Sequence, residues 1–162
     1  MNRLAICRAA PLVAALVLLP RPGVAQTETT VTAGAAAVLP SGATFNGIAL
    51  DGLRFGMLVI ISSDGSATGQ FQTTLLGRSD GGQPQNIEVE GEAKSGSVTI
   101  AGSATFSGSC TIDVGDGTPP LKDVPFTVTV SSTGESKGTL RLVLGDTSLP
   151  AAKVKEGSMT IE

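Results

Sequence analysis

The amino-acid sequence predicts an all-β fold, either an antiparallel β-sandwich or a small up-and-down β-barrel of about eight strands, preceded by a cleaved signal peptide. Two observations lead to this prediction. From Phe45 onward, apolar and polar residues alternate with a period of two, and Gly-containing turns separate the alternating segments. The N-terminal residues have the composition of an export signal.

The N-terminal segment has the parts of a secretory signal peptide. Arg3 and Arg8 precede a short apolar run over residues 12–19. Gly23 and Ala25 are the small residues of a cleavage site. The run is far shorter than the ~20 residues of a membrane-spanning helix. We therefore expect removal of residues 1–25, no stable membrane insertion afterwards, and a secreted or periplasmic protein.

Export would also change the charge and the cysteine count. Removal of residues 1–25 takes away three arginines and moves the formal net charge from −3 to −6. It also removes Cys7, so that Cys110 is left alone and no internal disulfide can form. A chain of this length can form one modest core by burial alone. We expect a single all-β domain over residues 45–162, with residues 26–44 as a flexible lead-in that contributes at most one edge strand near Thr29–Thr32.

Three residue types that often form catalytic, metal-binding or stacking sites are absent. The sequence has no His, no Trp and no Tyr, and five Phe. Without imidazole there is no Ser-His-Asp or Cys-His catalysis and no ordinary zinc site. Aromatic stacking on nucleic acid would depend on Phe alone, and the acidic charge repels phosphate. We therefore expect no enzyme activity, no cofactor and no nucleic-acid partner.

A β-hairpin is the clearest local signal after the lead-in. Asp64-Gly65 is typical of a tight turn, and the chain returns over residues 69–76. The strand before this turn is predicted to bury one face, formed by Phe55, Met57, Val59 and Ile61.

The rest of the chain repeats the alternation. Over residues 87–94, apolar residues and Gly alternate with Glu and Lys, which predicts a strand with one charged face. Ser95-Gly96 indicates a turn before a short strand over 97–100, and Ala101-Gly102 indicates a second turn. The later strands are predicted to turn inward Ala104, Phe106, Gly108, Cys110, Ile112, Val114, Val124, Phe126, Val128, Val130, Leu140, Leu142, Leu144, Met159 and Ile161.

Three pieces of this hairpin pattern occur in a familiar order. They are "SSDGSATGQF", then "VTIAGSATFSGSCTI", then "VPFTVTVSSTGESKGTLRLVL" with a closing "GSMTI". Together they resemble a group of small secreted bacterial β-domains, found as repeats or terminal modules of exported proteins. The resemblance covers residues 45–162. It implies a secreted β-module and no catalytic residues.

Three carboxylates share the charged face of one predicted strand. Glu88, Glu90 and Glu92 would lie about 6.5–7 Å from one neighbour to the next. This spacing suits the acid/base pair of a glycosidase. Such pairs face each other across a cleft, however, and the aromatic platforms that bind sugars are missing. A solvated sheet face is therefore the favoured interpretation.

A second acidic group flanks a Gly/Pro-rich loop. Asp113, Asp116 and Asp123 could supply oxygen ligands to calcium, but the spacing of an EF-hand loop is absent. Asp116-Gly117 is also an ordinary turn signal. A solvated turn is favoured, and calcium binding stays as the alternative.

Two weaker catalytic signals lie near the C-terminus. Asp146, in "LGDTSLP", is similar to the Asp-Thr/Ser-Gly turn of aspartic proteases, but those enzymes need two such aspartates. A loop cap is therefore favoured. Lys153 or Lys155 could activate a serine, but no spacing indicates which serine that would be.

Cys110 is expected to be part of the core. It alternates in register with Phe106 and Ile112, which predicts an inward side chain. Burial raises the pKa of a thiol, and no His is present to activate it. We expect an inert, space-filling residue, with a covalent partner as the alternative.

These observations favour a secreted, non-enzymatic β-module with a structural or protein-binding role. Its partner would be a protein or a cell surface, and we assign no catalytic, cofactor-binding or metal-binding residues. The alternative is a small β-barrel that binds an apolar small molecule. Its lining would be drawn from Phe45, Phe55, Phe71, Phe106 and Phe126.

Overall fold

The computed structural model describes residues 27–99, 102–132 and 138–162. The predicted signal peptide with its cleavage site lies outside the described residues, as do the last residue of the predicted strand over 97–100, the first residue of the predicted turn at Ala101-Gly102 and residues 133–137 of the turn predicted from "STGESKG". Ten β-strands form one antiparallel sheet. They are β1 (Glu28–Val38), β2 (Thr44–Phe45), β3 (Ile48–Ser62), β4 (Ser66–Arg78), β5 (Ile87–Thr99), β6 (Ser103–Asp113), β7 (Leu121–Ser132), β8 (Gly138–Leu144), β9 (Thr147–Ser148) and β10 (Ala152–Ile161).

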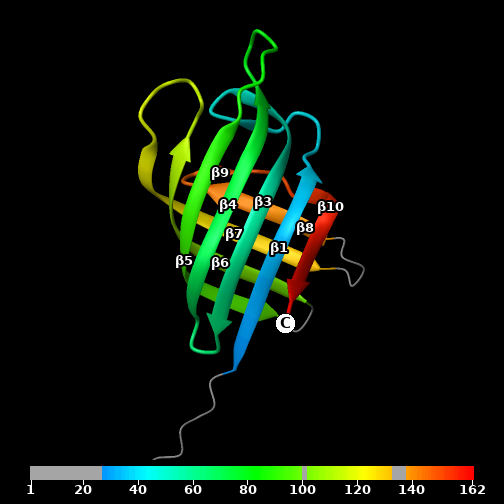
Figure 1. Cartoon of the computed structure of the whole chain (residues 1–162), viewed down its shortest axis with the longest axis vertical. Helices are drawn as coiled ribbons and strands as arrows, with labels where there is room; N and C mark the ends of the chain where they lie inside the picture. Colours follow the sequence, from blue (N-terminus) through cyan, green and yellow to red (C-terminus); the bar gives the residue numbers. More distant parts are fainter. Residues whose placement is uncertain (1–26, 100–101, 133–137) are drawn as a thin grey trace, which may run out of the picture.

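The sheet closes into a ring. From β3 to β8 each long strand pairs with the next one along the chain, β10 pairs with β8, and β1 joins β10 to β3. The short strands β2 and β9 pair only with β3 and β8. In Figure 1, β3, β4 and β5 run along the length of the molecule, while β7 and β8 cross behind them. The all-β prediction is therefore confirmed, and the arrangement is a single closed sheet with up-and-down order.

The expected lead-in is largely strand. Residues 28–38 form β1, which pairs on one side with β3 and on the other with β10. The prediction that this segment is a flexible lead-in is thus wrong, and β1 is not an edge strand. Val31, Ala33 and Ala37 are buried, so the segment does alternate, but with side chains too small to give a strong hydrophobic signal.

The predicted hairpin between β3 and β4 is confirmed. The Asp64 carboxylate accepts hydrogen bonds from the Ser66 amide at 2.9 Å and from the Ser66 hydroxyl at 2.6 Å. Gly65 has φ +86°, a conformation that a residue with a side chain rarely adopts. All four side chains predicted to face inward from β3 are buried.

The predicted turn at Ser95-Gly96 is wrong, because β5 continues to Thr99. The pairing with β6 shifts register between Ala93 and Ser95, which leaves Lys94 as an extra residue in a bulge. The segment stays in the sheet, paired with β6 from Ser95 to Thr99, and the Gly96 amide also donates to the Gly65 carbonyl at 3.0 Å. Ser-Gly here marks a bulge, a feature that has the same local composition as a turn.

The centre of the ring is filled by three aromatic rings. Phe71, Phe106 and Phe126 have ring centroids 5.8 to 6.2 Å apart. Phe71 and Phe106 have no exposed surface, and Phe126 has 2%. Edge-to-face and stacked contacts at these distances stabilise the core beyond simple area burial.

Candidate functional site

The carboxylates predicted on one strand face do lie there. Glu88, Glu90 and Glu92 are exposed on the outer face of β5. Glu88 is paired with Asp113 of β6, whereas Glu90 and Glu92 are paired with Thr111 and Ser109. The three glutamates therefore have different neighbours, and two of them face hydroxyl groups.

Two of the three acidic loop residues are used in turns, whereas Asp123 lies within β7. Asp113 accepts a hydrogen bond from the Gly115 amide at 2.9 Å. Asp116 accepts from the Thr118 hydroxyl at 2.6 Å and from the Thr118 amide at 2.9 Å. These bonds hold the pKa of the Asp116 carboxyl below its usual value. Within the described ranges, no group of three or more His, Cys, Asp or Glu side chains is placed to hold a metal ion.

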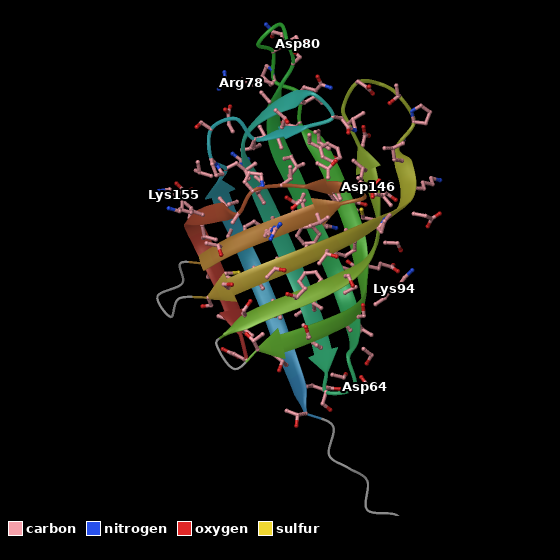
Figure 2. All side chains as sticks on the ribbon, turned by 180° about the vertical axis from the view of Figure 1, so that it is seen from behind. Asp64, Arg78, Asp80, Lys94, Asp146 and Lys155 are labelled. Atoms are coloured by element: carbon pink, nitrogen blue, oxygen red, sulfur yellow. The ribbon has the colours of Figure 1, made fainter. Side chains whose placement is uncertain are left out.

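The other two catalytic signals involve exposed side chains. Asp146 is exposed in the turn between β8 and β9, and Lys153 and Lys155 are exposed on β10. Figure 2 shows Lys94 and Lys155 projecting from different sides of the ring. The arrangement does not bring either lysine of β10 to a serine by any hydrogen bond among the described residues.

Cys110 is buried, as its register predicted. It has 4% of its surface exposed, and burial raises the pKa of its thiol to about 11. The thiol is therefore protonated at neutral pH and is a weak nucleophile. It lies between Gly91 of β5 and Val124 of β7 in the pairing of the strands.

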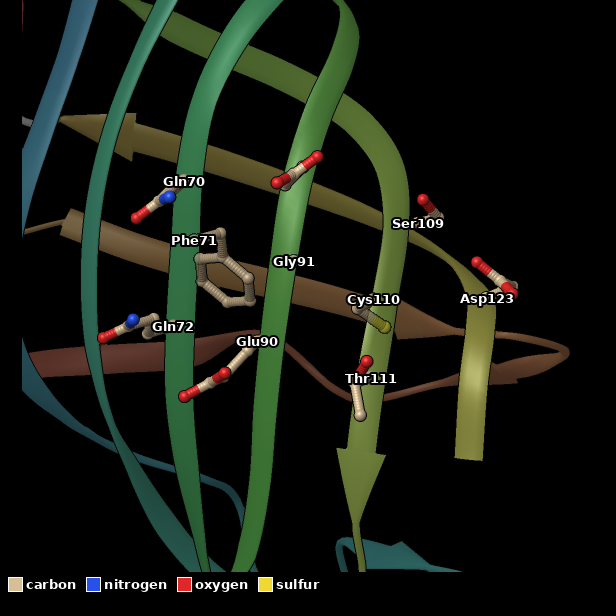
Figure 3. Close-up of a pocket in the computed structure, with 10 residues that line it drawn as sticks. Gln70, Phe71, Gln72, Glu90, Gly91, Ser109, Cys110, Thr111 and Asp123 are labelled. Carbon is tan, nitrogen blue, oxygen red and sulfur yellow. The ribbon is translucent and has the colours of Figure 1, made fainter. Parts of the chain in front are cut away.

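A groove crosses the outer face of the ring above Cys110. It has a volume of about 330 Å³. Figure 3 shows polar side chains entering it from neighbouring strands of one half of the ring. Its walls are polar side chains of β4 to β7, and its floor is Phe71, Gly91 and Cys110. The wall residues are Gln70, Gln72, Glu90, Glu92, Ser109, Thr111 and Asp123.

The glycine in the floor is required by the core beneath it. A Cβ atom at Gly91 would lie 2.7 Å from Cε1 of Phe126 and 3.1 Å from Cβ of Cys110. The Phe126 ring therefore occupies the space that a side chain at position 91 would need. The core thus keeps a residue without a side chain at the centre of the groove floor.

A second hollow adjoins the groove. It has a volume of about 470 Å³ and shares Ser109 and Asp123 with the first. Lys94, the residue of the β5 bulge, lies at its border, together with the exposed Pro125 and the buried Phe126. The first hollow is thus lined by three carboxylates, while the second has one lysine beside the carboxylate of Asp123 that the two hollows share.

The polar groups of the groove are available to a ligand. Within the part of the chain that the structure describes, the Glu90, Glu92 and Asp123 carboxylates accept no side-chain hydrogen bond and form no ion pair. The amides of Gln70 and Gln72 are likewise free of such bonds there. Three carboxylates with no cation among the groove's own lining residues favour a positively charged group.

Sequence reasoning identified only part of this groove. It placed Glu90 and Glu92 on a solvated face and Cys110 in the core, both without a ligand-binding role. It did not select Gln70 or Gln72, since nothing local joins β4 to β7. Asp123 was selected as a possible calcium ligand and not as part of this groove, and an inward-facing glycine within a strand, Gly91, was a further available signal.

Compared with protein-family models, curated proteins and solved structures, the chain has no match. In the described residues there is also no helix with the length and hydropathy needed to cross a bilayer.

Proposed function

We propose that the chain is a secreted, non-enzymatic module that binds a protein partner, and that the groove on β4 to β7 accepts a basic side chain of that partner. The observation behind this proposal is the set of three carboxylates and two amides around a hollow of about 330 Å³. Guanidinium and ammonium groups form their strongest hydrogen bonds with carboxylates. Arg suits the site best, since it can bond two carboxylate oxygens at once.

The position of the groove on paired strands supports a binding role. The backbone under Glu90 and Glu92 is paired with β4 on one side and β6 on the other. A site on such a backbone is ordered before the ligand arrives, so binding costs little conformational entropy. The adjoining hollow, with the exposed Pro125 at its border, offers room for a neighbouring residue of the partner.

A non-enzymatic role is supported by the chemistry of the same groove. Its thiol has a pKa of about 11, and the sequence contains no His to act as a base near neutral pH. An apolar ligand inside the ring has less support, because the side chains of Phe71, Phe106 and Phe126 are buried and pack against one another in its interior.

A titration with a small cation tests the proposal. N-acetyl-arginine amide is added to isotopically labelled protein, and amide NMR shifts are followed. Saturable shifts are expected at Gly91, Ser109 and Thr111. The citrulline analogue, which has the same shape without the charge, is expected to give none.

Two matched variants decide where the cation binds. The double substitution Glu90→Gln with Glu92→Gln should abolish the shifts, whereas Glu88→Gln, which lies on the same strand face outside the groove, should preserve them. Equal binding by both variants, or no binding by the unmodified chain, would overturn the proposal. Proteins captured from the native medium by the unmodified chain should likewise be lost with the groove variant.

A further inference from the structure

Asp123 has a backbone conformation that residues with a side chain seldom adopt. Its φ is +56°, and among the described residues Asn46 is the only other residue besides glycine with a positive φ. Asn46 precedes Gly47 in the tight turn between β2 and β3, where a positive φ is expected. Asp123 lies instead within β7, so no hairpin turn explains its conformation.

The conformation of Asp123 belongs to a bulge in β7. The pairing with β6 shifts register between Cys110 and Ile112, so that Lys122 and Asp123 both lie opposite Thr111. Glycine adopts a positive φ without a steric cost, whereas Asp only tolerates it better than most other residues do. The chain thus places a carboxylate where the backbone favours a residue without a side chain.

The carboxylate of Asp123 forms one wall of the groove. Glu90 and Glu92 line the groove from β5, and Asp123 lines it from β7, on the other side of β6. Figure 3 shows Glu90 and Asp123 on opposite sides of Thr111. Two strand spacings separate the backbones of β5 and β7, a distance of about 9.5 Å. Between them, β6 presents only the short side chains of Ser109 and Thr111 to the groove.

The fold does not use this carboxylate. Within the part of the chain that the structure describes, the Asp123 carboxylate accepts no hydrogen bond and forms no ion pair. The side chain is exposed and borders both hollows. A disfavoured backbone conformation that presents an unused polar group to a groove is typical of a ligand-binding residue.

On the basis of the function proposed above, we propose that Asp123 makes the groove specific for arginine over lysine. A guanidinium group presents five donors in a planar fork. It can therefore donate to Glu90 or Glu92 on one wall and to Asp123 on the other at the same time. An ammonium group is a compact charge with hydrogen bonds of about 2.7–2.9 Å, so it binds one wall at a time. The groove therefore recognises a protein partner with an exposed arginine.

Titration with two small cations tests this specificity. N-acetyl-arginine amide and Nα-acetyl-lysine amide are added separately to isotopically labelled protein, and the amide NMR shifts of Gly91, Ser109 and Thr111 give the two dissociation constants. The unmodified chain should bind the arginine amide about tenfold more tightly than the lysine amide. Asp123→Asn keeps a residue type that tolerates a positive φ and removes the charge. This variant should bind the arginine amide about tenfold more weakly, and the lysine amide less than about threefold more weakly.

Glu88→Gln is the matched control, since Glu88 belongs to the same acidic strand face but lines neither hollow. It should keep the full preference for arginine. Equal binding of the two amides by the unmodified chain, or an unchanged preference in Asp123→Asn, would overturn this inference and leave the binding of basic side chains intact. Absence of binding by both amides would overturn the proposed function together with this inference.

The melting temperature of a second variant separates specificity from a structural role. Asp123→Gly relieves the backbone at φ +56° and removes the carboxylate. Its melting temperature should be equal to or higher than that of the unmodified chain, while its preference for arginine should be lost. A lower melting temperature in Asp123→Gly would show that Asp123 stabilises the fold, and this result would overturn the proposal.

Discussion

The glycine in the groove floor gives the sharpest test of how the core and the surface are coupled. Gly91→Ala adds one methyl group directly above the Phe126 ring. The added carbon would lie 2.7 Å from Cε1 of that ring, about 1 Å closer than the ~3.5–4.0 Å of an ordinary carbon contact. Either the strand or the ring must therefore move.

The ring has little freedom to move. Phe126 has 2% of its surface exposed, and it is stacked on Phe71 at 5.8 Å and edge-on to Phe106 at 6.2 Å. Overpacking of this kind costs about 1–3 kcal/mol. Replacing Gly by Ala also restricts the unfolded chain, which offsets about 0.4–1 kcal/mol. We expect a net loss of about 1–2 kcal/mol in the free energy of unfolding.

Urea unfolding followed by far-ultraviolet circular dichroism measures this loss, since the chain has no Trp or Tyr for fluorescence. Gly56→Ala is the matched control. Gly56 also lies within a strand, but a Cβ atom there meets only the Ala33 carbonyl oxygen at 3.9 Å. This variant should be as stable as the unmodified chain or slightly more stable.

The cause can be tested separately from the size of the effect. In a Phe126→Leu background the ring is gone, and Gly91→Ala should then cost less than about 0.5 kcal/mol. Equal stability of Gly91→Ala and Gly56→Ala would refute the reasoning. So would a cost of Gly91→Ala that stays the same in the Leu background.

Three further outcomes follow from the core and the turns. Labelling of Cys110 by a thiol reagent should be slow in the folded protein and at least tenfold faster after unfolding in urea. Burial raises the pKa of this thiol from 9.0 to about 11, so the free energy of unfolding should fall as the pH rises from about 9 to about 11. In Cys110→Ala this fall should be smaller. Asp116→Ala should lower the melting temperature slightly at neutral pH. The pKa of the Asp116 carboxyl is lowered in the folded chain, so its contribution to stability is lost when it is protonated. The difference in melting temperature between the variant and the unmodified chain should therefore narrow as the pH falls below about 4. A fluorescent apolar probe should show no saturable binding to the folded chain, and saturable binding would instead favour an apolar ligand inside the ring.

Much of the fold follows from local sequence. The alternation around Met57, the Asp64-Gly65 turn and the inward register of Cys110 each depend on residues within a few positions of one another. A period of two in side-chain character is a direct consequence of the pleat of a strand. These features could therefore be predicted without knowledge of which strands pair.

Other features depend on contacts between distant segments. The segment that became β1 is rich in Ala, Thr and Gly, and it is held as a strand by partners on both sides. The groove combines Gln70, Glu90 and Asp123 from strands whose pairing contains three register shifts. Pairing register is a property of the folded sheet, so neither feature was available from periodicity alone.

The position of β1 also has a kinetic consequence. Val31 pairs with Val59 on one side and with Ile161 on the other, so the first strand to be synthesised needs the last one to complete its hydrogen bonds. Such non-local pairing raises the entropic barrier to folding and slows the final step. Until β10 emerges, β1 keeps an unpaired edge that can capture another nascent chain. Folding yield should therefore depend on how quickly the C-terminal strand follows the rest of the chain, even when the finished ring is stable.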